Sequence, residues 1–220
     1  INLEGLRKIG DPYTLSKKYY NEGVDEIILI DSVASLYSRN NLFHIVEKPV
    51  KDVFIPITLG GGIRSLKDIS KALKAGADKI AINSYVTENP NFINTSVNEF
   101  GSSTITIYIE AKKVGEKKWE VYKNYGRDKT GIDLIYLLNE IQDKNCGEIL
   151  LTSIDHEGMQ NGFDIELLNE IYELIKKPLI FSGGCGKLQD INEIKKNYKN
   201  VSLSIASAFH YEKIKLNELK

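Results

Sequence analysis

One two-part phrase occurs twice in this chain, and it constrains the fold more than any other feature. In the first copy the glycine-rich residues 59–64 lead through a helix-patterned stretch to residues 80–84. In the second copy residues 181–187 lead in the same way to residues 204–207. Glycines directly after an apolar strand allow a tight turn that aims backbone N–H groups at an anion. Two such turns in matching frames predict two phosphate sites.

The repeat extends beyond the glycines. A helical pattern over residues 10–23 precedes an apolar run that ends in Asp31, and a helix beginning near residue 130 precedes a run that ends in Asp155. Each half therefore contains three helix–strand pairs, whose strands end in Asp, in glycines and in small polar residues. This duplication predicts a single α/β domain over residues 1–220, built from half-barrels at about 1–102 and 103–220.

The apolar runs and the helical patterns between them predict parallel strands joined by crossover helices. The strands are expected near residues 25–31, 55–60, 79–83, 104–110, 148–154, 178–182 and 202–206. Seven strands are one fewer than a closed (β/α)₈ TIM barrel needs. The repeat places the counterpart of strand 104–110 before Ile1, so the first strand is expected to be missing from this sequence. Residues 112–126 look like a β-hairpin extension.

Composition narrows the class of protein. The 220 residues are 42% hydrophobic and carry a formal net charge of -1, which gives no bulk field for nucleic acid or an anionic membrane. No apolar run reaches the length of a membrane span. Cys146 and Cys185 are typical of reduced thiols in a cytoplasmic protein and are too few for a metal site. No metal, cofactor, nucleic acid or membrane partner is expected.

Several phrases resemble one known family. The chain is similar to the cyclase subunit of imidazole glycerol phosphate synthase, from histidine biosynthesis, over essentially all 220 positions. The phrases that carry the resemblance lie, in the family's order and spacing, at residues 10–12, 59–64, 75–79, 82–84, 150–155, 162–164 and 182–184.

The resemblance implies a phosphorylated substrate. The family's ribonucleotide has a phosphate at each end and lies across the C-terminal face of a (β/α)₈ barrel. The family's phosphate-binding positions are, in this sequence, Gly61, Gly62, Asn83 and Ser84 for one end and Gly183, Gly184, Ala206 and Ser207 for the other.

The resemblance also implies a partner at the opposite face. A glutaminase (glutamine amidotransferase) subunit docks on the N-terminal end of the family's barrel and supplies ammonia through a gate of alternating charges. Glu26, Lys79 and Glu148 occupy three gate positions, and Asp78 matches a residue that contacts the partner. Charges at strand starts are also found as solvated rim residues or as a buried ring of salt bridges.

The implied chemistry needs two acids, at the ends of the first and fifth strands, that act as general acid and base. Here the fifth-strand position is Glu110, one methylene longer than the family's aspartate, and the first-strand position is expected to precede this sequence. Other positions that match the family's pocket are Asp31, Asn83, Thr152, Asp155 and Ser182. Glu157 and Met159 stand where the family has Asp and Thr. His156 is expected to be an ordinary surface histidine, and Cys185 a packing thiol.

Three functions follow from these matches and departures. The first is an ammonia-using cyclase and lyase that makes imidazole glycerol phosphate and aminoimidazole carboxamide ribonucleotide. The second is a paralogue that channels ammonia for acetamidino-sugar formation in surface polysaccharide biosynthesis. The third is a non-catalytic barrel that binds phosphate ligands. An acid on the first strand favours the first function, and a non-acid there favours the others.

Overall fold

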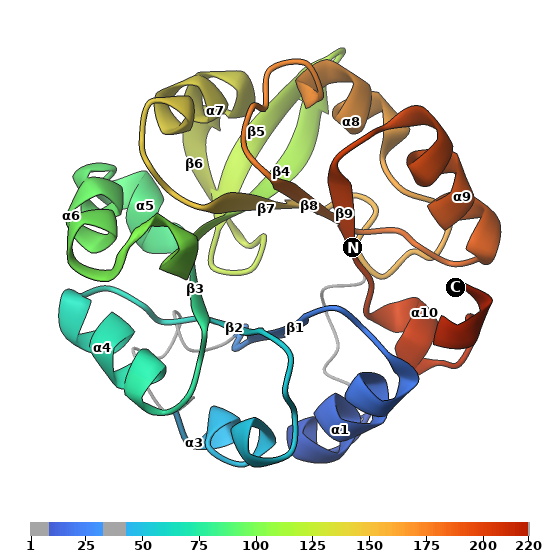
Figure 1. Ribbon diagram of the computed structural model, residues 1–220. Coiled ribbons are helices and arrows are strands. Elements are labelled where there is room, and N and C mark those ends of the chain that lie inside the picture. The colour runs from blue at the N-terminus through green and yellow to red at the C-terminus, as the bar shows by residue number, and fades with distance from the viewer. Residues whose placement is uncertain (1–8, 33–42, 220) are drawn as a thin grey trace.

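The computed structural model describes residues 9–32 and 43–219 as a ring of parallel strands surrounded by helices (Figure 1). The parallel strands are β1 (Ile27–Ile30), β2 (Ile57–Gly60), β3 (Lys79–Ile82), β4 (Ile105–Gly115), β7 (Glu148–Ser153), β8 (Leu179–Ser182) and β9 (Val201–Ser204). They neighbour one another in this order. All seven match expected strands, so the predicted α/β, TIM-barrel type of fold is confirmed.

Helices follow the strands on the outside of the ring (Figure 1). They are α1 (Pro12–Glu22), α3 (Phe43–Val46), α4 (Leu66–Lys74), α5 (Ser84–Glu88), α6 (Asn91–Phe100), α7 (Leu134–Gln142), α8 (Ile165–Ile171), α9 (Leu188–Asn197) and α10 (Ser207–His210). Short 3-10 turns lie at Pro49–Lys51, Ser102–Thr104 and Leu216–Glu218. No helix in the described ranges is long and apolar enough to cross a membrane.

Local sequence explains where the long helices begin. Asp11 accepts a hydrogen bond from the backbone N–H of Thr14 at the start of α1, and Pro12 occupies the first turn. Asp133 and Asp164 cap α7 and α8 in the same manner, and Ser65 caps α4. The caps fix the directions in which the helices leave the strand ends.

The expected hairpin extension is present. β4 continues past the ring and pairs antiparallel with β5 (Lys118–Lys123), which pairs with β6 (Asp128–Asp133). Trp119 and Val121 of β5 are buried and join the main core, so the hairpin covers α7 rather than standing free. Residues 130–132, expected to open a helix, belong to β6 because this pairing continues the hairpin, and the helix begins after Asp133.

The interior of the ring is separate from the core under the helices. Side chains alternate along each strand, so every second residue faces inward. Ala81, Tyr108, Leu150 and Ile180 form a small buried cluster of their own, against which Ile28 and Ile30 pack. The larger cluster, which includes Ile107, lies between the strands and the helices. The ring is therefore a packed core with an apolar layer at mid-height.

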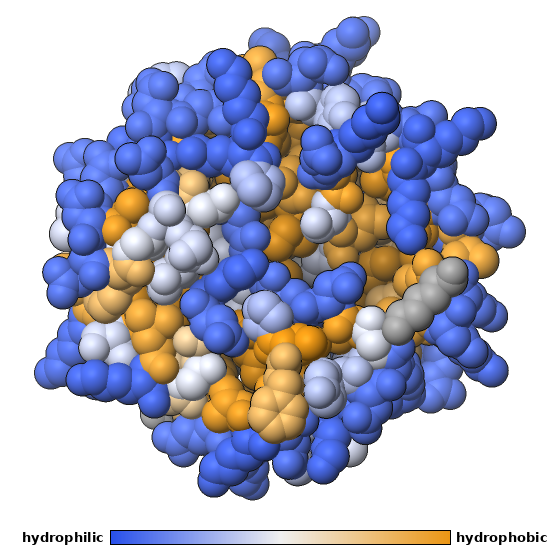
Figure 2. Space-filling view, viewed as in Figure 1, coloured by the Kyte–Doolittle hydropathy of each residue, from blue (hydrophilic) through white to orange (hydrophobic). Residues whose placement is uncertain are grey.

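β1 and β9 are the two edges of the parallel sheet, and within the described residues they do not pair with each other. A cavity of about 740 Å³ lies between them, lined by residues of α1, β1, β8 and β9 among others. Figure 2 shows polar residues around the periphery of one face of the molecule and apolar residues exposed toward its middle. The expected first strand lies outside the described residues and stays a prediction.

Packing at Gly76 provides a test of the fold. Gly76 has φ +110°, and a Cβ there would lie 2.6 Å from Val50 Cγ1. We expect Gly76→Ala to lower the free energy of unfolding by about 2–4 kcal/mol, from backbone strain plus the clash. Gly131→Ala is the matched control, because its φ is +73° with no atom within 4 Å of the new methyl group; it should cost only about 1 kcal/mol. Equal losses in urea unfolding would contradict the packing of Val50 on this turn.

Candidate active site

Two glycine turns open the C-terminal end of the ring. Gly61 and Gly62 follow β2 with φ values of 108° and 68°, and Gly183 and Gly184 follow β8 with φ values of 105° and 99°. A Cβ on Gly61 would lie 2.5 Å from the Asp31 carbonyl oxygen, and one on Gly184 would lie 2.1 Å from that of Gly162. Both turns therefore need glycine for conformation and for space. Their matching backbones agree with the repeat in the sequence.

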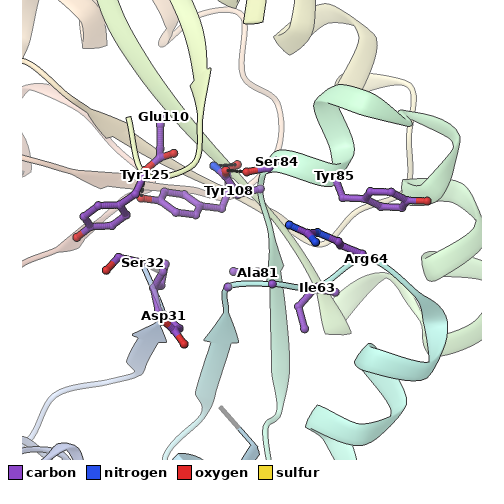
Figure 3. Close-up of a pocket in the computed structure, with 14 residues that line it drawn as sticks. Asp31, Ser32, Ile63, Arg64, Ala81, Ser84, Tyr85, Tyr108, Glu110 and Tyr125 are labelled. Atoms are coloured by element: carbon purple, nitrogen blue, oxygen red, sulfur yellow. Dashed lines mark hydrogen bonds between the residues drawn. The ribbon is translucent and has the colours of Figure 1, made fainter. Parts of the chain in front are cut away.

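The first turn lines a pocket at the ends of β1 to β4 (Figure 3). Six residues expected from the sequence line it: Asp31, Gly61, Gly62, Asn83, Ser84 and Glu110. Asn83 donates a hydrogen bond to the Tyr108 carbonyl at 3.0 Å, and Ser84 Oγ donates to Asn83 Oδ1 at 2.9 Å. These bonds hold the Asn83 amide over the pocket.

Glu110 is the buried carboxyl group of this pocket. Glu110 is only 2% exposed to solvent. Burial raises its pKa to about 7, against hydrogen bonds that favour the ionised form. Tyr108 Oη donates to Oε1 at 3.1 Å, and the Gly126 N–H donates to Oε2 at 3.3 Å. A carboxyl group with this pKa exchanges a proton readily at neutral pH, as a general acid–base group requires.

The turn between β5 and β6 closes one side of the pocket. Asn124, Tyr125 and Gly126 all have positive φ, and the Asn124 N–H donates to Ser84 Oγ at 3.1 Å. Figure 3 shows the Tyr125 side chain beside Tyr108 and Glu110. Burial, then the charges of Glu157 and Glu110, raises the pKa of Tyr125 to about 12, so its hydroxyl stays protonated.

Among the lining residues that sequence reasoning missed, three bear on the chemistry of this pocket. Tyr108 lies two residues before Glu110 on the same inward face of β4, and strand alternation alone is enough to find it. Arg64 supplies a positive charge at the end of the first glycine phrase, and it lines the pocket from the side opposite Tyr125 (Figure 3). Tyr125 had no signal in the sequence, because its position depends on how the hairpin bends back over β4.

The second glycine turn lines a separate pocket at the ends of β8 and β9. The expected residues that line it are Ser182, Gly183, Gly184, Ala206 and Ser207. Glu157 also lines it, whereas Met159 does not and is 45% exposed. The structure thus brings the two expected groups of phosphate-binding residues into two pockets on one face of the ring.

Thr152 and Asp155 occupy different settings. Thr152 is buried and lies opposite Glu110 in the pairing of β4 with β7. Asp155 is exposed and accepts a hydrogen bond from the Lys113 N–H at 2.8 Å, outside the residues that line either pocket. Its expected part in the site stays a prediction.

His156 and Cys185 have local explanations. His156 Nδ1 lies 2.8 Å from the Gly162 carbonyl oxygen, which accepts the ring proton. Burial raises the pKa of the Cys185 thiol to about 12, so little thiolate is present for nucleophilic attack. These contacts favour the structural interpretation for both residues.

A charged cluster lies at the opposite, N-terminal end of the ring. Lys79 Nζ lies 2.7 Å from Glu26 Oε2 and 3.1 Å from Glu148 Oε1. Thr58 donates to Glu26, and Thr106 donates to Glu148 at 2.8 Å. Burial lowers the Lys79 pKa, but the hydrogen bonds and charges of the two glutamates outweigh it and leave the pKa raised. Within the described residues the three predicted gate positions form one ion-paired group.

Asp78, beside the cluster, is exposed and accepts the Ile57 N–H at 2.8 Å. This bond holds the carboxylate at the start of β2, on the side of the ring where the charged cluster lies.

Comparisons with known proteins agree with this geometry. The family described as "Histidine biosynthesis protein" matches residues 2–215. Imidazole glycerol phosphate synthase subunit HisF of Legionella pneumophila is 47% identical over 192 residues, which are 87% of this chain and 91% of the relative. The subunits of the same name from Bacillus cereus (strain Q1) and Prochlorococcus marinus (strain MIT 9215) are each 42% identical over the whole chain and 87% of their own lengths.

Burial of Glu110 predicts a pH dependence of stability. Its folded pKa of about 7 lies above the ordinary value of 4.5, so its stabilising contribution is full below pH 4.5 and is lost as the pH rises through 7. We expect the unfolding free energy of the parent relative to Glu110→Gln to fall by up to about 3 kcal/mol between pH 4 and pH 8. Urea unfolding at both pH values measures the difference. Parallel behaviour of the two proteins would show that Glu110 titrates normally.

Proposed function

We propose that this chain, which belongs to the family of histidine biosynthesis proteins, is the ammonia-using cyclase and lyase subunit of an imidazole glycerol phosphate synthase. The substrate is a ribonucleotide with two phosphates, and the products are imidazole glycerol phosphate and aminoimidazole carboxamide ribonucleotide. The observation that carries this proposal is the buried Glu110, with a pKa of about 7, on the same face as two glycine turns.

The two turns support binding of an elongated, doubly phosphorylated molecule. Backbone N–H groups at left-handed glycines form concave sites that suit phosphate oxygens. In the first pocket Ser84 and Arg64 add a hydroxyl and a positive charge, and in the second Ser182 and Ser207 add hydroxyls. A substrate held at both ends passes over the strand ends between the pockets, where Glu110 and Thr152 lie.

Glu110 supplies the acid–base chemistry. At neutral pH a group with a pKa of about 7 is present in both forms, so it can give a proton to a leaving group and take one during ring closure. Tyr108 and the Gly126 N–H fix the carboxyl orientation. Asp31, on the same pocket wall, contributes a second carboxyl group. The substrate is positioned by Thr152, Asn83 and Ser182. Asp155 holds the backbone of β4 at Lys113, beyond the end of the ring.

Ammonia enters at the other end. Glu26, Lys79 and Glu148 form the gate, and the apolar layer of Ala81, Tyr108, Leu150 and Ile180 separates it from Glu110. An ion that leaves the gate for this layer loses its hydration, whereas neutral ammonia pays a much smaller penalty. The apolar layer thus favours passage of ammonia over ammonium.

The partner is a glutaminase subunit on the N-terminal face. The exposed Asp78 carboxylate is placed to meet a cationic or N–H donor group of that subunit, next to the gate. A protein of this kind works in the cytoplasm, and the two free cysteines are in keeping with that compartment.

One observation favours the acetamidino-sugar paralogue as a second candidate. Glu110 and Glu157, both in the pockets, are longer than the family's aspartates, and Met159 lacks the hydroxyl of the family's threonine. Such changes at a tuned site reduce the original turnover. In that case the gate and partner face serve the sugar pathway. A barrel that binds phosphate ligands without turnover is the remaining alternative.

The first test of the proposed function is turnover of the family's ribonucleotide with saturating ammonium, using the full-length protein. We expect imidazole glycerol phosphate to form, and Glu110→Gln to lower kcat at least 100-fold because the proton exchange is lost. Glu110→Asp should retain more activity than Glu110→Gln, since it keeps an ionisable group. If the folded parent binds the ribonucleotide but forms no product, the paralogue or the non-catalytic barrel is correct.

The gate is tested with the glutaminase subunit present. We expect Lys79→Met to reduce glutamine-dependent product formation about tenfold or more while ammonium-dependent turnover changes less than twofold, because only the supply route is altered. Lys74→Met, on the outer helix α4, is the matched control and should leave both rates unchanged. A parallel fall of both rates in a folded Lys79→Met protein would contradict a channel at this position.

A further inference from the structure

The two glycine pockets differ in their charged residues. Arg64 lines the first pocket together with the carboxyl groups of Asp31 and Glu110, whereas Glu157 is the one charged residue among those that line the second, all of which lie in the described part of the chain. The repeat therefore preserved the backbone of the two turns but not the charge around them. A doubly charged anion in the second pocket faces a carboxyl group with no cation to offset it.

Glu157 is held close to the turn. Its Oε2 atom lies 3.5 Å from the place that a Cβ on Gly183 would occupy. Across residues 9–32 and 43–219, no hydrogen bond or ion pair engages its carboxyl group. The carboxyl group has therefore lost much of its hydration, and no described residue forms a hydrogen bond or ion pair with it. Such a group is costly while ionised.

The surroundings of Glu157 favour its neutral form. Burial raises its pKa. The titratable groups that face it are Tyr125, from the β5–β6 turn, and Tyr108, from β4. Its chain neighbours point elsewhere, because His156 bonds the Gly162 carbonyl oxygen and Asp155 bonds the Lys113 N–H.

We propose that an anion enters the second glycine pocket only together with a proton on Glu157, so that phosphate binding there takes up one proton. The protonated carboxyl group donates its O–H to an anion oxygen, alongside the backbone N–H groups of the turn and the hydroxyls of Ser182 and Ser207. An ionised Glu157 instead repels the anion at short range. The inference rests on the proposed function for the presence of a phosphate in this pocket.

This coupling makes Glu157 a specificity-determining residue. It selects anions that bind together with a proton, so the second pocket holds an anion more weakly as the pH rises. A substrate with two phosphates is then held by both ends at low pH and mainly by one end at high pH, which eases release of the product fragment from the second pocket.

Sulfate is the probe for the test, because it resembles phosphate but does not titrate between pH 6 and 8.5. The Ser84→Asp protein removes the first pocket by adding a negative charge there, and it also removes any effect of Glu110 on that pocket's anion. Titration calorimetry at pH 6 and 8.5 measures sulfate binding to the second pocket. We expect the association constant to fall at least tenfold, since a proton-coupled site loses up to about tenfold per pH unit above its pKa.

The matched variant is Ser84→Asp with Glu157→Gln. Its uncharged amide cannot ionise, so sulfate affinity should change less than twofold between the two pH values, and heats in buffers of different ionisation enthalpy should show no proton uptake. Equal affinities at both pH values in Ser84→Asp alone would overturn the proton coupling but leave the phosphate assignment intact. No sulfate binding to folded Ser84→Asp at either pH, with binding retained by Ser207→Asp, would overturn the second phosphate site itself.

Discussion

The alternation of side chains along parallel strands is the constraint on which the rest of this structure depends. In each strand the inward residues form levels that neighbouring strands share through their register. Thr106 pairs with Glu148 at the lower level, Tyr108 with Leu150 at the middle, and Glu110 with Thr152 at the upper level. A one-residue slip of β4 would turn all three inward side chains toward the helices. The charged cluster, the apolar layer and the buried acid are thus fixed by one register.

The charged side chains at the lower and upper levels are stabilised in different ways. At the lower level Lys79 is paired with two glutamates, so its charge is balanced and the ions persist at neutral pH. At the upper level the described donors to Glu110, among them Tyr108 and the Gly126 N–H, are neutral, and burial raises its pKa to about 7. A charge with a counter-ion is suited to a fixed gate, whereas a charge without one is suited to proton exchange. The apolar layer between them keeps the two behaviours independent.

The sequence was sufficient for the strands, the repeat and the glycine turns, because these depend on local patterns. Apolar runs identify the seven parallel strands, each of which begins within two residues of its predicted start, and Gly61 and Gly183 have positive φ as a tight turn requires. The sequence was not sufficient for Tyr125 or for the isolation of Glu157. The first depends on how the hairpin folds back, and the second depends on which side chains fail to reach a carboxyl group. Both are properties of tertiary distance, which no local pattern records.

The two halves of the duplicated chain share the backbone of their glycine turns and differ in the side chains around them. Gly62 and Gly184 share left-handed conformations that other residues rarely adopt, so substitution there is strained. The residues that follow the turns and strands are free of this restriction. The charged residues of the two similar pockets differ while the ring stays intact, since Arg64 lines one with Asp31 and Glu110, whereas Glu157 is the one charged residue that lines the other within the described part of the chain. A symmetric scaffold can in this way hold the two ends of one ligand with different strength, and the direction of that difference is set by single side chains at strand ends.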